Sequence, residues 1–260
     1  PGAAAALSIM RAVETAGGLL LCEMMWHSYA TASAQNTQLS HVLGFCPDAP
    51  AYLVVEAALE QDALLETLES FFETGEIMDA VLAKSRKESA DIWRIREDSD
   101  AASRTIENPL WFDVSVPLRQ LDSYGVGGQE ALAAMDGQVQ CHILAHLGDG
   151  NLHLNIGRAE VWNAEEKRQV SLIVERGVKE MGGAVSAEHG IGVHKLSTFG
   201  RNVPAGNLAA MRAIKAALDP NNILNPGKVI GNALISNALI AANALEALLR
   251  PFGNAVTAKV

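Results

Sequence analysis

Two alternating segments separated by a glycine-rich turn constrain the fold of this chain more than any other feature. Residues 142–147 (HILAHL) and 152–156 (LHLNI) alternate polar and apolar side chains, as half-buried β-strands do. The intervening residues 148–151 (GDGN) favour turns and tolerate positive φ angles. The sequence therefore predicts a β-hairpin. One face would carry His142, Leu144, His146, His153 and Asn155, and the other Ile143, Ala145, Leu147, Leu152, Leu154 and Ile156.

The two histidines nearest the turn would lie together in this hairpin. If Leu147 pairs with Leu152, His146 stands opposite His153, and the two Cβ atoms are about 4.5–5.5 Å apart. Two imidazoles at that separation can reach one metal ion. The alternative is two surface histidines on a solvated sheet face. The opposed geometry, the turn chemistry and Asn155 on the same face favour a site over that alternative.

A third ligand is available in residues 186–192 (SAEHGIG), where Glu188 is followed by His189. The small residues around this pair allow the backbone to approach a ligand closely. Two imidazoles and one carboxylate leave coordination positions open, and zinc, manganese or iron fits such a set. A local hydrogen bond between Glu188 and His189 is the alternative, and spacing alone does not decide between the two.

The order of helices and strands favours an α+β fold with an antiparallel sheet over a doubly wound parallel sheet. Small polar residues at 28–40 indicate a loop, and the glycines at 125–128 are expected to break a helix over 118–135. A capping box at Asn163 and Glu166 begins a helix that we expect to continue to Met181. Further strands are expected at 19–25, 51–59 and 112–116, and further helices at 3–16, 64–75, 84–105, 208–218 and 234–249.

Composition excludes several classes of protein. Of 260 residues, 49% are hydrophobic, which is enough for a core, and the formal charge of −10 argues against a nucleic-acid partner. The sequence has neither a run of about 18 apolar residues nor a signal peptide at its start. Its three widely spaced cysteines indicate reduced thiols, so we expect a cytoplasmic protein.

Five motifs resemble one family. They are WRIRE (93–97), DVSVP (113–117), HLGDGNLHLN (146–155), SAEHGIG (186–192) and LDPNNILNPGKV (218–229). Together they resemble the C-terminal domain of FAD-linked oxidoreductases of the vanillyl-alcohol oxidase type, whose members include D-lactate, glycolate and D-2-hydroxyglutarate dehydrogenases. The resemblance covers about residues 1–230 and is specific for the family but not for a substrate.

The resemblance implies a fold and a place in a larger enzyme. Two ferredoxin-like halves, about 1–110 and 111–230, would share one antiparallel sheet covered by helices, and residues 231–260 would form a helical tail. This domain would lie over the flavin and build the substrate pocket. The family's FAD-binding domain is absent from the sequence, so we expect a fragment of a longer enzyme, or a subunit whose flavin domain is elsewhere. The chain alone is expected to be inactive.

The resemblance also implies an activity, the oxidation of a small D-2-hydroxy acid to a 2-oxo acid by hydride transfer to FAD. The electron acceptor is not identified, and a homodimer stays open. The residues of this chain that match the family's functional positions are the metal ligands His146, His153 and Glu188, the catalytic base His189, the substrate contacts Arg96 and Asn155, and, on the flavin side, Asn225 and Lys228.

Two departures from the family bear on the substrate. Relatives specific for dicarboxylates have a lysine just before the Asp113 motif, where this chain has Trp111 and Phe112. Asp100 replaces a threonine that binds substrate in those relatives. We therefore expect a substrate whose distal end is less charged than that of 2-hydroxyglutarate. The rival interpretations are a non-catalytic metal- or small-molecule-binding module and a metallohydrolase that uses the same three ligands.

Overall fold

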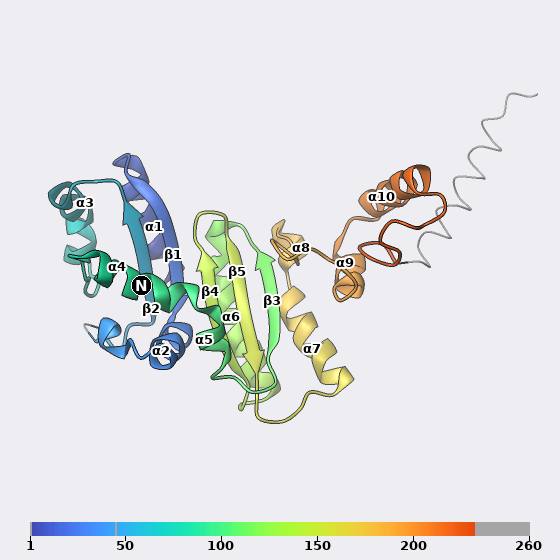
Figure 1. Cartoon of the computed structure of the whole chain (residues 1–260), viewed down its shortest axis with the longest axis horizontal. Coiled ribbons are helices and arrows are strands. Elements are labelled where there is room, and N and C mark those ends of the chain that lie inside the picture. Colours follow the sequence, from blue (N-terminus) through green and yellow to red (C-terminus); the bar gives the residue numbers. More distant parts are fainter. Residues whose placement is uncertain (1, 45, 232–260) are drawn as a thin grey trace, which may run out of the picture. The chain divides into compact units, whose positions relative to one another are not determined.

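The computed structural model describes residues 2–44 and 46–231 (Figure 1). The chain divides into two compact units, Pro1–Glu188 and His189–Val260, and each is considered by itself. The predicted helix at 234–249 lies outside the described residues. The expected boundary near residue 110 falls inside the first unit and stays a prediction.

A five-stranded antiparallel sheet organises the first unit. The strands are β1 (Leu19–Trp26), β2 (Ala51–Ala57), β3 (Leu110–Ser115), β4 (Gln140–His146) and β5 (Asn151–Gly157). Their order is β2-β1-β4-β5-β3, and each neighbouring pair is antiparallel. The sheet confirms the predicted α+β class and places the hairpin β4–β5 at its middle, so the hairpin has a neighbouring strand on either side.

One face of the sheet forms the larger hydrophobic core. Side chains from the helices α1 (Ala3–Thr15), α6 (Leu121–Met135) and α7 (Ala164–Glu175) pack against it. The predicted apolar face of the hairpin lies here, since Ile143 and Leu152 are fully buried in this core. Burying this face fixes which side chains point the other way, because residues alternate between the two faces of a strand.

The other face is covered by α2 (His27–Asn36), α4 (Arg86–Glu97) and α5 (Ser99–Ser103), which form a smaller core with Met25 and Leu144. The loop predicted at 28–40 is wrong, because α2 occupies most of it. Its small residues let the helix lie close to the sheet: Ala30 and Ser33 are fully buried, and the Ser33 hydroxyl donates to the carbonyl of Ile95. Packing outweighs the weak helical pattern of the segment.

Three predicted helices are divided or continued differently in the structure. The one predicted at 84–105 is two helices, α4 and α5, which meet at Asp98. Helix α6 runs unbroken through its glycines. A Cβ at Gly125 would lie only 3.2 Å from the Trp26 ring, so the missing side chain lets the helix pack closely against Trp26. The helix that begins at the confirmed Asn163–Glu166 capping box ends at Glu175. Gly177, at φ 74°, separates it from the short helix α8 (Val178–Met181), a backbone angle that glycine adopts without strain.

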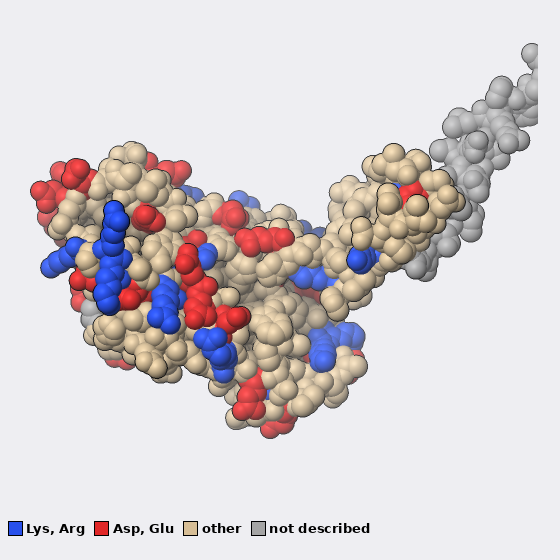
Figure 2. All heavy atoms as spheres, viewed as in Figure 1, with Lys and Arg blue, Asp and Glu red and all other residues tan. Residues whose placement is uncertain are grey.

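The remaining helices are divided between the two units. The first unit also contains α3 (Gln61–Glu73) and 3₁₀ turns at Ser40–Leu43 and Leu118–Gln120, and the second unit contains α9 (Leu196–Asn202) and α10 (Ala205–Leu218). No described helix is both long enough and apolar enough to cross a membrane. Acidic and basic side chains are interspersed on the face of the first unit that Figure 2 shows.

The register of the hairpin differs from the predicted one by two residues. His146 pairs with Asn151, and His153 pairs with Leu144, so the two histidines are diagonal neighbours. The loop is residues 147–150, because Leu147 turns into the core, where it is fully buried, and its N–H donates to the carbonyl of Cys22 on β1. A shift of two residues keeps every side chain on its predicted face.

Candidate metal and substrate site

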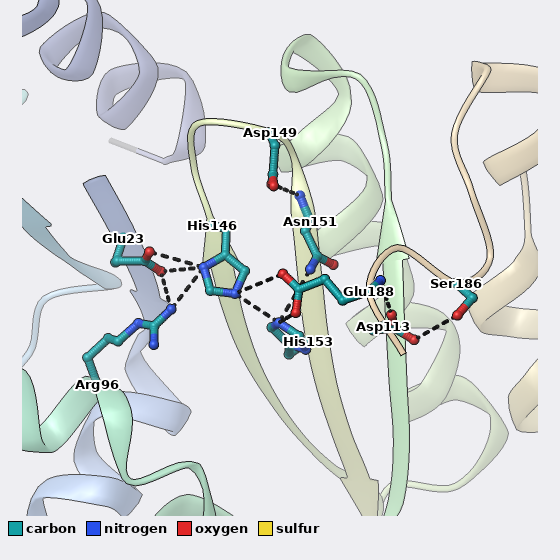
Figure 3. Close-up of polar contacts among 9 residues, drawn as sticks. All are labelled: Glu23, Arg96, Asp113, His146, Asp149, Asn151, His153, Ser186 and Glu188. Carbon is teal, nitrogen blue, oxygen red and sulfur yellow. Dashed lines mark hydrogen bonds and ion pairs between the residues drawn. The ribbon is translucent and has the colours of Figure 1, made fainter. Parts of the chain in front are cut away.

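Three predicted ligands converge on the histidine face of the sheet (Figure 3). The Nε2 atoms of His146 and His153 are 3.0 Å apart, and the Glu188 carboxylate oxygens lie 3.6 Å from the first and 3.7 Å from the second. Within the described parts of the chain, this is the one group of three or more His, Cys, Asp or Glu side chains with ligand atoms within 4.8 Å of one another. All three residues belong to the first unit.

The spacing of these donor atoms suits a single divalent ion. Ligand atoms held about 2.0–2.2 Å from one ion at tetrahedral or octahedral angles are separated by about 3.0–3.6 Å. The separations among His146, His153 and Glu188 are close to that range. The imidazole nitrogens are borderline donors and the carboxylate is a hard donor, and this combination suits zinc, manganese or iron. Glu188 is half exposed, at 48% of its side chain, so the site is open to solvent.

Strand β3 positions the third ligand. An antiparallel bridge between Ser115 and Ala184 draws the chain beside the edge of β3. Two residues away on β3, the fully buried Asp113 accepts the backbone N–H of Glu188 at 2.7 Å and the Ser186 hydroxyl at 3.4 Å. Asp113 also lies directly opposite His153 in the β3–β5 register. One carboxylate therefore fixes the loop that brings Glu188 to the two histidines.

A second carboxylate lies on the other side of His146. Glu23 of β1 pairs with His146 across the strands, is only 6% exposed, and has carboxylate oxygens 2.9 and 3.0 Å from His146 Nδ1. Its hydrogen bond raises the pKa of His146, while burial and the nearby Arg96 act in the opposite direction. The Nη2 of Arg96 lies 3.0 Å from Glu23 and 2.9 Å from the same Nδ1.

The two predicted substrate contacts lie at different ends of this face. Arg96, at the end of α4, contacts His146, whereas Asn155 is further along β5 and donates to the Ser103 hydroxyl at 3.0 Å. The Nε of Arg96 is buried and has no hydrogen-bond partner among the described residues. An anionic ligand that accepted from this guanidinium would satisfy that donor.

The side chains that pair with or contact Asn155 are uncharged. Asn155 lies opposite His142 on one side and Trp111 on the other. Burial lowers the pKa of His142 to about 4, so its ring is uncharged at neutral pH, and its Nε2 lies 2.9 Å from the Thr105 hydroxyl. Trp111 is 60% exposed and donates its indole N–H to Ser103.

Three further predicted residues lie in the second unit. His189 is its first residue, directly after Glu188 in the chain. Asn225, with a φ of 50°, accepts the Lys228 ammonium at 3.3 Å and the Lys228 backbone N–H at 3.3 Å. These two residues thus form a local turn, as the Asn-Pro-Gly-Lys sequence favours.

Sequence reasoning gave no role to three polar residues at the site. Glu23 lies in an otherwise apolar strand segment. A single charged residue in such a segment indicates that its carboxylate is buried with a partner of opposite charge or a hydrogen-bond donor. Asp113 appeared only as part of a motif, and its contact with Glu188 joins residues far apart in sequence. The sequence predicts Asn151 in the turn, but this residue begins β5, and its side-chain nitrogen lies 3.4 Å from His153 Nε2.

A family model described as "FAD linked oxidases, C-terminal domain" matches residues 1–229. The chain belongs to this family. The family's matched span covers all of the polar residues described above, so the ligand set, Glu23 and Asp113 lie within a C-terminal domain of an FAD-linked oxidase.

Three relatives of this FAD-linked oxidase domain are named as D-2-hydroxyglutarate dehydrogenases. The Xanthomonas citri pv. viticola protein is 32% identical over 206 residues, which cover 74% of this chain and 43% of the relative. The mitochondrial protein of Arabidopsis thaliana is 35% identical over 181 residues, 66% of this chain and 31% of its own length. The mitochondrial protein of Bos taurus is 30% identical and matches 88% of this chain and 42% of its own length. The chain thus spans less than half the length of these relatives.

Proposed function

We propose that this chain is the substrate- and metal-binding cap domain of an FAD-dependent dehydrogenase that oxidises a D-2-hydroxy acid to the 2-oxo acid. The observation that carries the proposal is the convergence of His146, His153 and Glu188 beside Arg96, in a chain of the FAD-linked oxidase family. The relatives named as D-2-hydroxyglutarate dehydrogenases support the reaction class. Family membership argues against a metallohydrolase built on the same ligands.

The ligand set has a defined part in this proposal. His146, His153 and Glu188 would hold a divalent ion and leave positions open for the hydroxyl and carboxylate of the substrate. When bound, the ion would lower the pKa of the hydroxyl and the flavin would accept the hydride. The partly exposed carboxylate of Glu188 is consistent with a site that a small acid can enter.

Arg96 would clamp the substrate carboxylate. A guanidinium presents donors in a planar fork that matches a carboxylate, and the buried Nε of Arg96 lacks an acceptor within the described residues. Asn155 would offer a neutral hydrogen-bonding group further from the ligands. We assign the proton transfer to His189, because an imidazole nitrogen can accept and release a proton and this residue follows Glu188 in the chain.

The distal end of the substrate is proposed to be less charged than that of 2-hydroxyglutarate. Trp111 lies opposite Asn155 on the same face as His153, so an uncharged aromatic side chain occupies that position. Asp100, at the exposed start of α5, would repel a second carboxylate. A monocarboxylic 2-hydroxy acid therefore fits the proposal better than a dicarboxylic one.

Other parts of the proposal concern the fold and the surroundings. We retain the two ferredoxin-like halves, the approach of Asn225 and Lys228 to the flavin, and a cytoplasmic location as predictions. Association into a homodimer is likewise a prediction.

The decisive experiment uses the product of the complete gene. We expect a flavin absorption spectrum, stoichiometric divalent metal, and bleaching of the flavin by a D-2-hydroxy acid but not by its L-enantiomer. His153→Ala should remove the metal and the bleaching while retaining the flavin, and Arg168→Met, at an exposed ion pair on α7, should retain all three. A product that binds metal but never exchanges electrons with a 2-hydroxy acid would instead favour a non-catalytic binding module.

A further inference from the structure

Glu23 contacts two residues of the candidate site at once. Its carboxylate lies 2.9–3.0 Å from His146 Nδ1 and 3.0 Å from Arg96 Nη2 (Figure 3). It reaches both from β1, whose register sets it directly opposite His146. The Glu23 side chain is only 7% exposed, so water competes little for its two oxygens.

The proton on His146 decides whether this residue can bind a metal ion. A neutral imidazole has one N–H and one lone pair, and only the lone pair can bind a cation. The atom that faces His153 and Glu188 is Nε2. His146 is therefore a metal ligand through Nε2 only when its proton is on Nδ1.

The two neighbours of Nδ1 favour opposite tautomers. The Glu23 carboxylate can only accept a hydrogen bond, so it favours an N–H on Nδ1 and a lone pair on Nε2. Arg96 can only donate, and its Nη2, 2.9 Å from Nδ1, favours a lone pair there and a proton on Nε2. Glu23 also accepts from Arg96 and so offers the guanidinium another acceptor.

We infer that Glu23 is a positioning residue that sets His146 in its metal-binding tautomer and offers the guanidinium of Arg96 an acceptor other than the ring nitrogen. The inference deepens the proposed metal site and rests on it only for its consequence in metal binding. A cation on Nε2 would require Nδ1–H to donate to Glu23. Arg96 would then keep Glu23 as its acceptor and lose the one on His146, which frees donors for a substrate carboxylate.

The test combines the tautomer with metal affinity in the 260-residue chain. The ¹⁵N shifts of the His146 ring, measured without metal above the titration range of the ring, should report Nδ1–H in the native chain. In Glu23→Gln they should move toward Nε2–H. Zinc affinity, measured by competition with a chromogenic chelator, should fall about 10- to 100-fold in Glu23→Gln, as is common when a carboxylate behind a histidine ligand is lost.

Two variants separate positioning from a general structural effect. Glu23→Asp keeps the charge and the accepting oxygens, so it should recover part of the affinity and the Nδ1–H tautomer. Glu56→Gln removes an exposed carboxylate from the neighbouring strand β2 and should leave both quantities unchanged. Circular dichroism checks that each variant is folded.

The outcomes distinguish this inference from the proposed function. An unchanged tautomer in folded Glu23→Gln would overturn the positioning role, whatever the metal affinity does. Absence of zinc, cobalt and manganese binding by the native chain would overturn the metal site, and the tautomer measurement would still decide the part played by Glu23.

Discussion

The buried carboxylate of Asp113 accepts the backbone N–H of Glu188 at 2.7 Å, across 75 positions of sequence. This contact holds a partly exposed ligand by its main chain and leaves the Glu188 side chain facing His146 and His153. The geometry of the candidate site thus depends on a residue that is not itself a ligand.

Replacement of Asp113 by Asn should weaken metal binding. The amide keeps the shape but loses the charge that strengthens the hydrogen bond to Glu188, so the third ligand is held less well. We expect zinc affinity to fall by about 10-fold or more, as for other groups that orient ligands. Competition titration measures the affinity, and Glu165→Gln, on the exposed surface of α7, is the control. Unchanged affinity in a folded Asp113→Asn chain would contradict the positioning role.

Replacement of Trp111 by Lys should shift substrate preference in the product of the complete gene. A positive charge opposite Asn155 would attract a second carboxylate of the substrate. We expect kcat/KM for a D-2-hydroxy dicarboxylate, relative to D-lactate, to rise about five- to tenfold, equivalent to roughly 1–1.4 kcal/mol. Trp111→Met removes the ring without adding charge. An equal rise in that variant would show that bulk, rather than charge, limits the substrate.

The thiols of Cys22 and Cys141 should resist modification in the native chain. Burial raises the pKa of Cys22 to about 12, with Glu23 adding to the shift, and burial raises the pKa of Cys141 to about 12. Since the thiolate is the reactive species, both should react slowly with a chromogenic disulfide at mild alkaline pH. Cys46 and Cys141 are both half-buried. We expect Cys46 to react first, because burial of the Cys141 thiol raises its pKa. Cys46→Ala should abolish the fast phase, and unfolding in guanidinium should expose every remaining thiol.

Acid should weaken an ion-pair cluster beyond the site. Arg158, with its side chain only 10% exposed, pairs with Glu166 at 2.6 Å and with Asp136 at 2.7 Å. The Arg158 hydrogen bond lowers the pKa of Glu166 below its usual value near 4.5, and the Asn163 backbone N–H lowers it further. A lowered pKa means that Glu166 stabilises the fold above pH 4.5, and that this stability is lost as the pH falls through the folded value.

The measurement is Tm as a function of pH. Arg158→Met should lower Tm at neutral pH and reduce the further loss of Tm on acidification below 4.5 relative to the native chain. Arg168→Met breaks a pair on the same helix whose arginine is 58% exposed, so solvent screening should make its effect smaller. Parallel Tm–pH curves for the native chain and Arg158→Met would argue against the cluster.

Sequence patterns predicted the hairpin and its two faces because alternation and turn chemistry are local properties. They did not predict the register, since Leu147 leaves the ladder only because the core offers it a place. Helix α2 was missed for a similar reason. Its alanines and serines form no strong apolar stripe, and their burial depends on the sheet beneath them.

The site was predictable to the extent that motifs name its ligands. His146, His153 and Glu188 were proposed from sequence and lie together in the structure. Their supports Glu23 and Asp113 act through pairings between strands and between a strand and a distant loop. Such contacts follow from strand order, which one sequence does not specify.

The boundary between the two compact units falls between Glu188 and His189, so the proposed ion and the proposed base belong to different units. Co²⁺ or Mn²⁺ bound by the first unit would be a paramagnetic centre at a known position in that unit. The nuclear relaxation that the ion induces in the second unit depends on distance, so it would measure how far His189 lies from the ion. A comparison with and without substrate would show whether substrate binding brings His189 close enough to accept the proton of the substrate hydroxyl.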